Sequence, residues 1–105
     1  MKNFFVIECA YHLTGDNTIE CYKNFDNARK AFTALLKAQF IDDGTRYQDF
    51  RITFKNKDLD IEREFEDLEE CQEFILKNAK NISYVWYDTG DIFGHFSLGN
   101  AKFED

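Results

Sequence analysis

The sequence predicts an α+β domain in which a largely antiparallel sheet carries two helices on one face, in the order ββα-ββα-ββ. Short segments of alternating apolar and polar residues occur in pairs separated by turn residues, a pattern typical of β-hairpins. Two longer segments repeat their apolar residues at helical spacing. With 105 residues, 44% of them hydrophobic, the chain has room for one domain with its own core. Short connections after each hairpin favour antiparallel neighbours and a shared helix layer.

The first predicted unit is a hairpin followed by a helix. Turn residues at positions 14–17 separate its two strands. The side chains expected on the buried face of this hairpin are Phe5, Ile7, Cys9 and Tyr11 before the turn, and Ile19 and Cys21 after it. Residues 27–41 change to helical spacing. The expected buried stripe of this helix is Ala28, Ala31, Phe32, Leu35 and Leu36.

The second predicted unit repeats this order. The side chains expected to be buried in its hairpin are Phe50, Ile52 and Phe54, then Leu59 and Ile61. A two-residue turn at Asn56 and Lys57 would pair Phe54 with Leu59 and so set the register. A helix is expected over residues 67–79, with Asp67 as its N-cap.

The chain is predicted to be a single domain over residues 1–105. Residues 82–98 form its C-terminal hairpin around a turn at 88–91, where Gly90 can adopt a positive φ. Residues 4–44 and 46–81 look like two copies of one unit, because a shift of 40 positions aligns their apolar residues. Chance similarity of two amphipathic units is the alternative, and the predicted architecture does not depend on the choice.

Composition indicates the cellular compartment of the protein and the class of its partner. Three cysteines without CxxC spacing are typical of reduced thiols, and no apolar run is long enough for a signal-peptide core or a membrane span. We therefore expect a cytoplasmic protein that does not bind membranes. The formal charge of −7 argues against direct nucleic-acid binding, which depends on lysine and arginine, and favours a protein partner with a basic surface.

Acidic residues are concentrated between positions 58 and 73. This segment holds nine carboxylates and one arginine, a net charge of −8 against −7 for the whole chain. Alternate strand residues share a face at about 6.6 Å intervals, a pitch that could imitate a phosphate backbone and block a nucleic-acid-binding site. The candidate partner-binding residues are Asp58, Asp60, Glu62, Glu64, Glu66, Glu69, Glu70 and Glu73.

A solvated structural face is the alternative interpretation of the same charges. The predicted register places Lys55 beside Asp58 and Arg51 beside Glu62, and such cross-strand pairs are worth a few tenths of a kcal/mol each. Under that register Asp60 and Glu64 have no cationic neighbour.

Aromatic residues provide a second candidate surface. Both faces of the third hairpin and of the first strand are apolar, and helices on one side of a sheet cover only one of them. The candidate interface residues are Phe4, Tyr84, Trp86, Tyr87, Phe93 and His95. Burial within the monomer, a homodimer interface and a foreign partner are the three interpretations.

Enzyme and cofactor signatures are lacking in the sequence. There is no G-x-G-x-x-G, Walker loop, nucleophile elbow or HExxH spacing, so we expect no catalytic residue, metal or cofactor. The sequence therefore favours a non-enzymatic acidic protein-binding module. An inhibitor or antagonist fits best, by analogy of size and charge with phage anti-defence and toxin-immunity proteins. A small enzyme or ligand-binding domain using the aromatic hairpin as a pocket wall, with His95 as its polar group, is the alternative.

Overall fold

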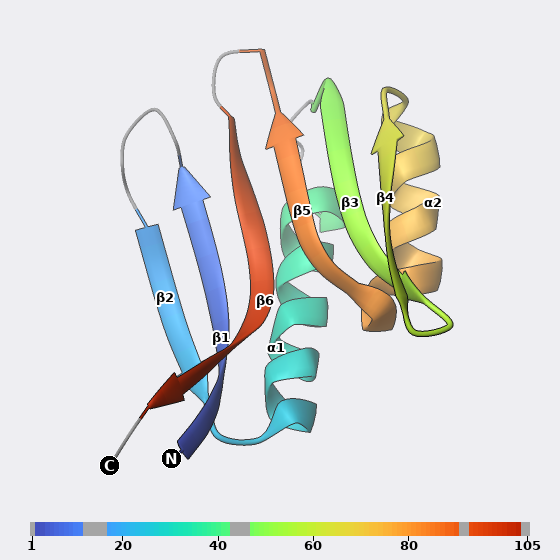
Figure 1. The fold of residues 1–105 in the computed structure, drawn as a ribbon. Helices are drawn as coiled ribbons and strands as arrows, with labels where there is room; N and C mark the ends of the chain where they lie inside the picture. The colour runs from blue at the N-terminus through green and yellow to red at the C-terminus, as the bar shows by residue number, and fades with distance from the viewer. Residues whose placement is uncertain (1, 12–16, 43–46, 91–92, 104–105) are drawn as a thin grey trace.

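The computed structural model describes residues 2–11, 17–42, 47–90 and 93–103, and it confirms the predicted α+β fold (Figure 1). Six antiparallel strands form one sheet in the order β2-β1-β6-β5-β3-β4, with two helices in the sequence order ββα-ββα-ββ. The elements are β1 Lys2–Tyr11, β2 Asn17–Tyr22, α1 Phe25–Lys37, β3 Asp49–Asn56, β4 Leu59–Phe65, α2 Leu68–Asn78, β5 Ile82–Asp88 and β6 Phe93–Phe103. A π-helical turn, Ala38–Asp42, extends α1, and a 3-10 turn, Ala79–Asn81, extends α2. No helix among the described residues has the length and apolar character needed to cross a membrane.

Both helices begin at a polar cap and lie on the same face of the sheet (Figure 1). The side chain of Asn24 accepts hydrogen bonds from the backbone N–H groups of Asp26 (2.7 Å) and Asn27 (3.2 Å). Asp67 does the same for Glu69 (2.9 Å) and Glu70 (3.4 Å), as predicted. These caps satisfy backbone donors that have no partner within the helix. Because Asn24 is the cap, α1 begins two residues earlier than the sequence pattern predicted.

The core lies between the sheet and the two helices. Phe32 and Leu36 of α1 and Ile75 of α2 are fully buried against Ile52 and Val85 of the central strands. Cys71 is buried among them, and burial raises the pKa of its thiol to about 12, so it packs as a neutral apolar group.

The π-helical turn brings an aromatic side chain into this core. The ring of Phe40 lies 5.0 to 5.8 Å, centroid to centroid, from the rings of Tyr47, Phe50, Tyr87 and Phe96, all in edge-to-face geometry. Tyr87, one of the candidate interface residues, is buried within the monomer: its side chain is 2% exposed and stacks on Phe96. Alternation correctly placed the side chains of Trp86 and Tyr87 on opposite faces of the strand. It could not identify which of the two faces the helices would cover.

The register of the second hairpin differs from the prediction by two residues. The turn consists of Lys57 and Asp58, both with positive φ (51° and 67°), and Phe54 pairs with Ile61. This register pairs Phe50 with Phe65, and both side chains are buried beneath the helix layer. A two-residue shift preserves the face of every side chain, so the predicted alternation remains valid while the predicted partners do not.

Three expected core residues of the hairpins, Leu59, Ile19 and Cys21, are exposed instead. Leu59 lies at the tip of β4 opposite Asn56, beyond the helix layer, and is 68% exposed. Ile19 pairs with Glu8 and is 60% exposed. Cross-strand partners share a face, so Ile19 and Cys21 point away from the helices, whereas Thr18 and Glu20 point toward them.

The cysteine arrangement follows from the same register. Cys9 pairs with Thr18 and Cys21 pairs with Val6, so the two thiols lie on opposite faces of the sheet. All three cysteines are free. Other parts of the predictions fall on His12, Asp91, Ile92 and most of the first turn, which lie outside the described residues.

The two predicted copies occupy equivalent places in the sheet. β1 and β3 flank the central β5–β6 hairpin, while β2 and β4 form the two edges. The caps Asn24 and Asp67 are 43 positions apart (67 − 24), and the same shift takes buried Phe32 to buried Ile75. A shift of 43 rather than the predicted 40 therefore matches the helices, and a true duplication stays a prediction.

Candidate functional site

The face of the sheet opposite the helices brings the two candidate surfaces together. Within the described residues it carries no helix, and we call it the helix-free face (Figure 1). One row of cross-strand partners on it runs from β4 to β6 and consists of Glu64, Arg51, Trp86 and His95. The next row runs from β4 to β1 and consists of Glu62, Thr53, Tyr84, Ser97 and Glu8. The acidic edge strand and the aromatic hairpin are thus parts of one surface.

Aromatic and charged groups in these rows contact one another directly. The guanidinium carbon of Arg51 lies 5.1 Å from the ring centroid of Trp86, a cation–π distance. The ring of His95 stacks on Tyr84 at 5.3 Å with an interplanar angle of 24°. His95 Nε2 lies 2.8 Å from Glu8 Oε1. Burial raises the pKa of the Tyr84 phenol, and the carboxylates of Glu62 and Glu8 raise it further.

These contacts account for part of the exposed aromatic surface that the sequence predicted. Tyr84 and Trp86 are only half-exposed, because neighbouring side chains cover part of each ring. Phe4 is also half-buried, and Phe93, at the end of β6, is 38% exposed. The sequence missed Arg51 and Glu8 as members of this surface, since nothing local to either residue indicates which strand lies beside it.

The acidic ladder on β4 is paired differently from the prediction. Asp60 lies opposite Lys55 and Glu64 lies opposite Arg51. Both carboxylates therefore have a cationic neighbour, whereas the predicted register gave them none. Glu62 lies opposite Thr53 and has no cation directly across from it. Asp58 belongs to the turn and not to the ladder. All four carboxylates are exposed.

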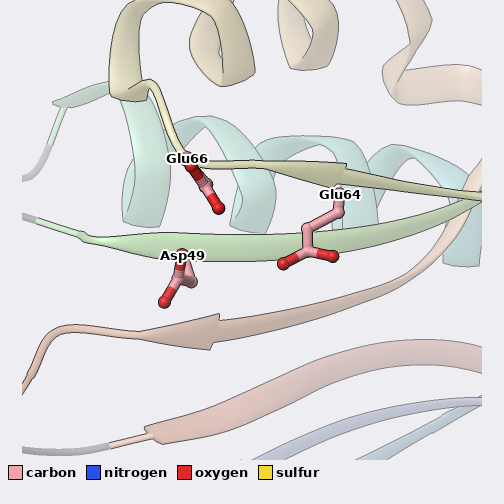
Figure 2. Close-up of side chains that lie close together, drawn as sticks. All are labelled: Asp49, Glu64 and Glu66. Atoms are coloured by element: carbon pink, nitrogen blue, oxygen red, sulfur yellow. The ribbon is translucent and has the colours of Figure 1, made fainter.

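Three carboxylates converge at one end of the ladder (Figure 2). Asp49 of β3, Glu64 of β4 and Glu66 each place one oxygen within 4.8 Å of the other two. Carboxylate oxygens at this spacing are ligands that Mg²⁺ or Ca²⁺ accepts, and they equally suit the ammonium or guanidinium group of a protein. Asp49 is a further site residue that the sequence pattern did not identify.

The acids of α2 form a separate group on the other side of the edge strand. Glu70 Oε1 accepts a 2.8 Å hydrogen bond from Arg63, and Asp67 is occupied in capping the helix. Glu69 and Glu73 are exposed. The eight predicted partner-binding residues therefore divide around β4, and only Asp60, Glu62, Glu64 and Glu66 belong to the helix-free side.

Cavities among the described residues include four with volumes of about 200 to 550 Å³. None of these four is lined by Tyr84, Trp86 or His95. The largest of these four runs along α1 and is lined by Asp26, Arg29, Lys30, Thr33, Ala34, Lys37 and Lys80. This cavity places four cationic side chains, Arg29, Lys30, Lys37 and Lys80, on the helix side of the sheet.

Comparison with protein-family models, curated proteins and solved structures finds no match for this chain. The functional argument therefore rests on the geometry and charge of the helix-free face.

Proposed function

We propose that this chain is a non-enzymatic protein-binding module whose helix-free face binds a basic surface of a target protein. The observation that carries the proposal is the shared face of Glu62 and Glu64 with Tyr84 and Trp86. A partner that contacts the acidic edge strand also reaches the aromatic centre of the sheet. Aromatic side chains supply contact area at such interfaces, and charges supply orientation and association rate.

The chemistry of the proposed partner follows from the acidic end of this face. Asp49, Glu64 and Glu66 offer three clustered carboxylate oxygens, a geometry suited to an arginine or lysine side chain. Exposed carboxylates that continue along β4 at strand spacing extend this surface toward the hairpin tip. A protein that normally binds nucleic acid presents a complementary row of cations, so the module acts as an inhibitor or antagonist of such a target.

The test begins with a target captured from native lysate at low salt, released at high salt, identified by mass spectrometry and purified. Its association rate should fall steeply with salt, because the Debye length shortens from about 10 Å at 0.1 M to about 3 Å at 1 M. Glu62→Lys should slow association, since Glu62 is exposed and faces Thr53 without a cation opposite.

Glu73→Lys is the matched control. It makes the same charge change at an exposed glutamate, but on α2 and therefore on the other side of the edge strand. The proposal requires Glu62→Lys to weaken binding much more than Glu73→Lys. Equal effects of the two variants, or no effect of either, would show that the helix-free face does not form the interface.

A further inference from the structure

The helix layer leaves part of the sheet uncovered. A helix with its side chains is about 10 Å wide and neighbouring strands are about 4.8 Å apart, so one helix covers roughly two strands. Six strands therefore need three helices, and the described residues provide two. In Figure 1, α2 lies behind β4 and α1 lies behind the middle of the sheet, from where it contacts β1, β2 and β6, whereas no helix lies directly behind β2.

An apolar groove marks this uncovered position. It has a volume of about 330 Å³ and lies between α1 and the β1–β2 hairpin. Its lining residues are Ile7, Cys9, Thr18 and Glu20 from the strands and Ala31, Ala34, Leu35 and Ala38 from the helix. Burial, with smaller contributions from Glu20 and Glu8, raises the pKa of the Cys9 thiol to about 11, which is consistent with its apolar surroundings.

The equivalent position in the second half of the chain is filled. There Phe74 of α2 packs against Phe54 and Phe65, with ring centroids 4.8 and 5.1 Å away. The shift of 43 positions that relates the two N-caps takes Ala31 to Phe74. An alanine where the other half has a phenylalanine leaves the groove open, and small residues along a helix permit close approach of a second helix.

We propose that this groove binds helix α1 of a second copy of the chain, giving a two-fold symmetric dimer in which the two α1 helices lie side by side. Each helix then occupies the uncovered position over the β1–β2 hairpin of the other copy. Charge complementarity supports a second copy as the occupant: Lys30 is exposed on α1, and Glu20 is exposed in the groove. Two-fold symmetry makes the Lys30–Glu20 pair twice.

The dimer interface lies on the helix side of the sheet and does not involve the helix-free face. Each copy would present its acidic face outward, so the inference goes beyond the proposed function and does not depend on it. Loss of dimerisation and loss of target binding are separate measurements on the same variants.

Sedimentation equilibrium between about 1 and 100 µM tests the proposal, because a dimer of this kind should dissociate in that range. Ala34→Glu places a charge on the exposed flank of α1, where the residue remains a good helix former. It should raise the dimer dissociation constant at least about tenfold, since the longer, charged side chain would lie within the contact between the two helices.

Leu76→Glu is the matched control on the other helix. Leu76 of α2 is 54% exposed and does not line the groove, so the substitution adds the same charge and should leave the dimer intact. Lys30→Glu and Glu20→Lys should each weaken the dimer, and combining them in one chain should restore it.

Three results would overturn the proposal, whatever the stability of the Ala34→Glu variant. One is a strictly monomeric parent protein over the whole concentration range. Another is a dimer that Leu76→Glu abolishes and Lys30→Glu does not. The third is a charge-exchanged double variant that associates no better than either single variant.

Discussion

At the scale of single residues, Arg63 is a charged side chain that packs against core aromatic rings at the edge of the sheet. It lies on the helix side of β4 between Ile61 and Phe65, where alternation would place an apolar residue. Its guanidinium carbon lies 4.6 Å from the ring centroid of Phe65 and 5.5 Å from that of Phe74. Its Nη2 donates a 2.8 Å hydrogen bond to Glu70. The guanidinium group covers the aromatic rings while the side chain remains about half exposed to water.

These contacts predict that removing the Arg63 side chain and removing the Glu70 side chain lower the free energy of unfolding by different amounts. Arg63→Ala should lower the free energy of unfolding by about 1 kcal/mol, because it removes the cover over both rings. Glu70→Ala should cost less than about 0.5 kcal/mol, since the pair is about half exposed. Urea unfolding measures both. Arg63→Lys should fall between the parent and Arg63→Ala, and equal losses for the two alanine variants would assign the stabilisation to the ion pair instead.

At the scale of elements, the sequence predicted the strand faces of the second hairpin better than its strand partners, whereas in the first hairpin it placed Ile19 and Cys21 on the wrong face. Alternation correctly assigned Phe50, Ile52 and Phe54 to the helix side, because the pleat forces successive side chains to opposite faces. Register depends on the turn. Neither Lys57 nor Asp58 indicates a positive φ as strongly as glycine or asparagine would.

The same distinction explains the candidate site. Acidic clustering between residues 58 and 73 is visible in the sequence, as is the aromatic hairpin. Their union on one face depends on the pairing of β3 with β5, which brings Arg51 beside Trp86. Pairing between distant strands leaves no local pattern, so the sequence could not predict it. The inward position of Tyr87 follows from helix packing and was equally invisible.

The turn of the second hairpin yields a prediction of its own. A two-residue turn with positive φ at both positions is the type that asparagine followed by glycine adopts with least strain. Replacing Lys57 by Asn and Asp58 by Gly should raise the free energy of unfolding by about 1 kcal/mol. The reason is that Lys57 and Asp58 hold a left-handed backbone conformation, which is strained for their side chains. Chemical denaturation measures the gain.

Asn56→Gly serves as the control for the register. Asn56 is the last residue of β3, so glycine there should destabilise by about 0.5 to 1 kcal/mol. The earlier predicted register would make Asn56 a turn residue and reverse that sign. Destabilisation by the Asn-Gly turn would contradict the positive φ values of both positions.

At the scale of the whole molecule, the last two strands of the sequence hold the two halves together. In the strand order β5 and β6 are central, with β1 beside β6 and β3 beside β5. Val85 and Phe96 place fully buried side chains between the sheet and the helices. Within the sheet, the β5–β6 hairpin joins the first half of the chain to the second half, and it follows both halves in the sequence.

This arrangement predicts that residues 1–81 alone will not fold cooperatively. Removing β5 and β6 leaves β1 and β3 as unpaired edges and uncovers the buried side chains of α1, including Phe32. Circular dichroism should show a broad thermal transition for this fragment. Adding a peptide of residues 82–105 in trans should restore a cooperative one, because the peptide supplies both central strands. A chain ending at Asn100 is the control, since it retains the whole of β5 and the β6 positions that pair with β5. A cooperative melt of the 1–81 fragment by itself would show that the halves fold without their central hairpin.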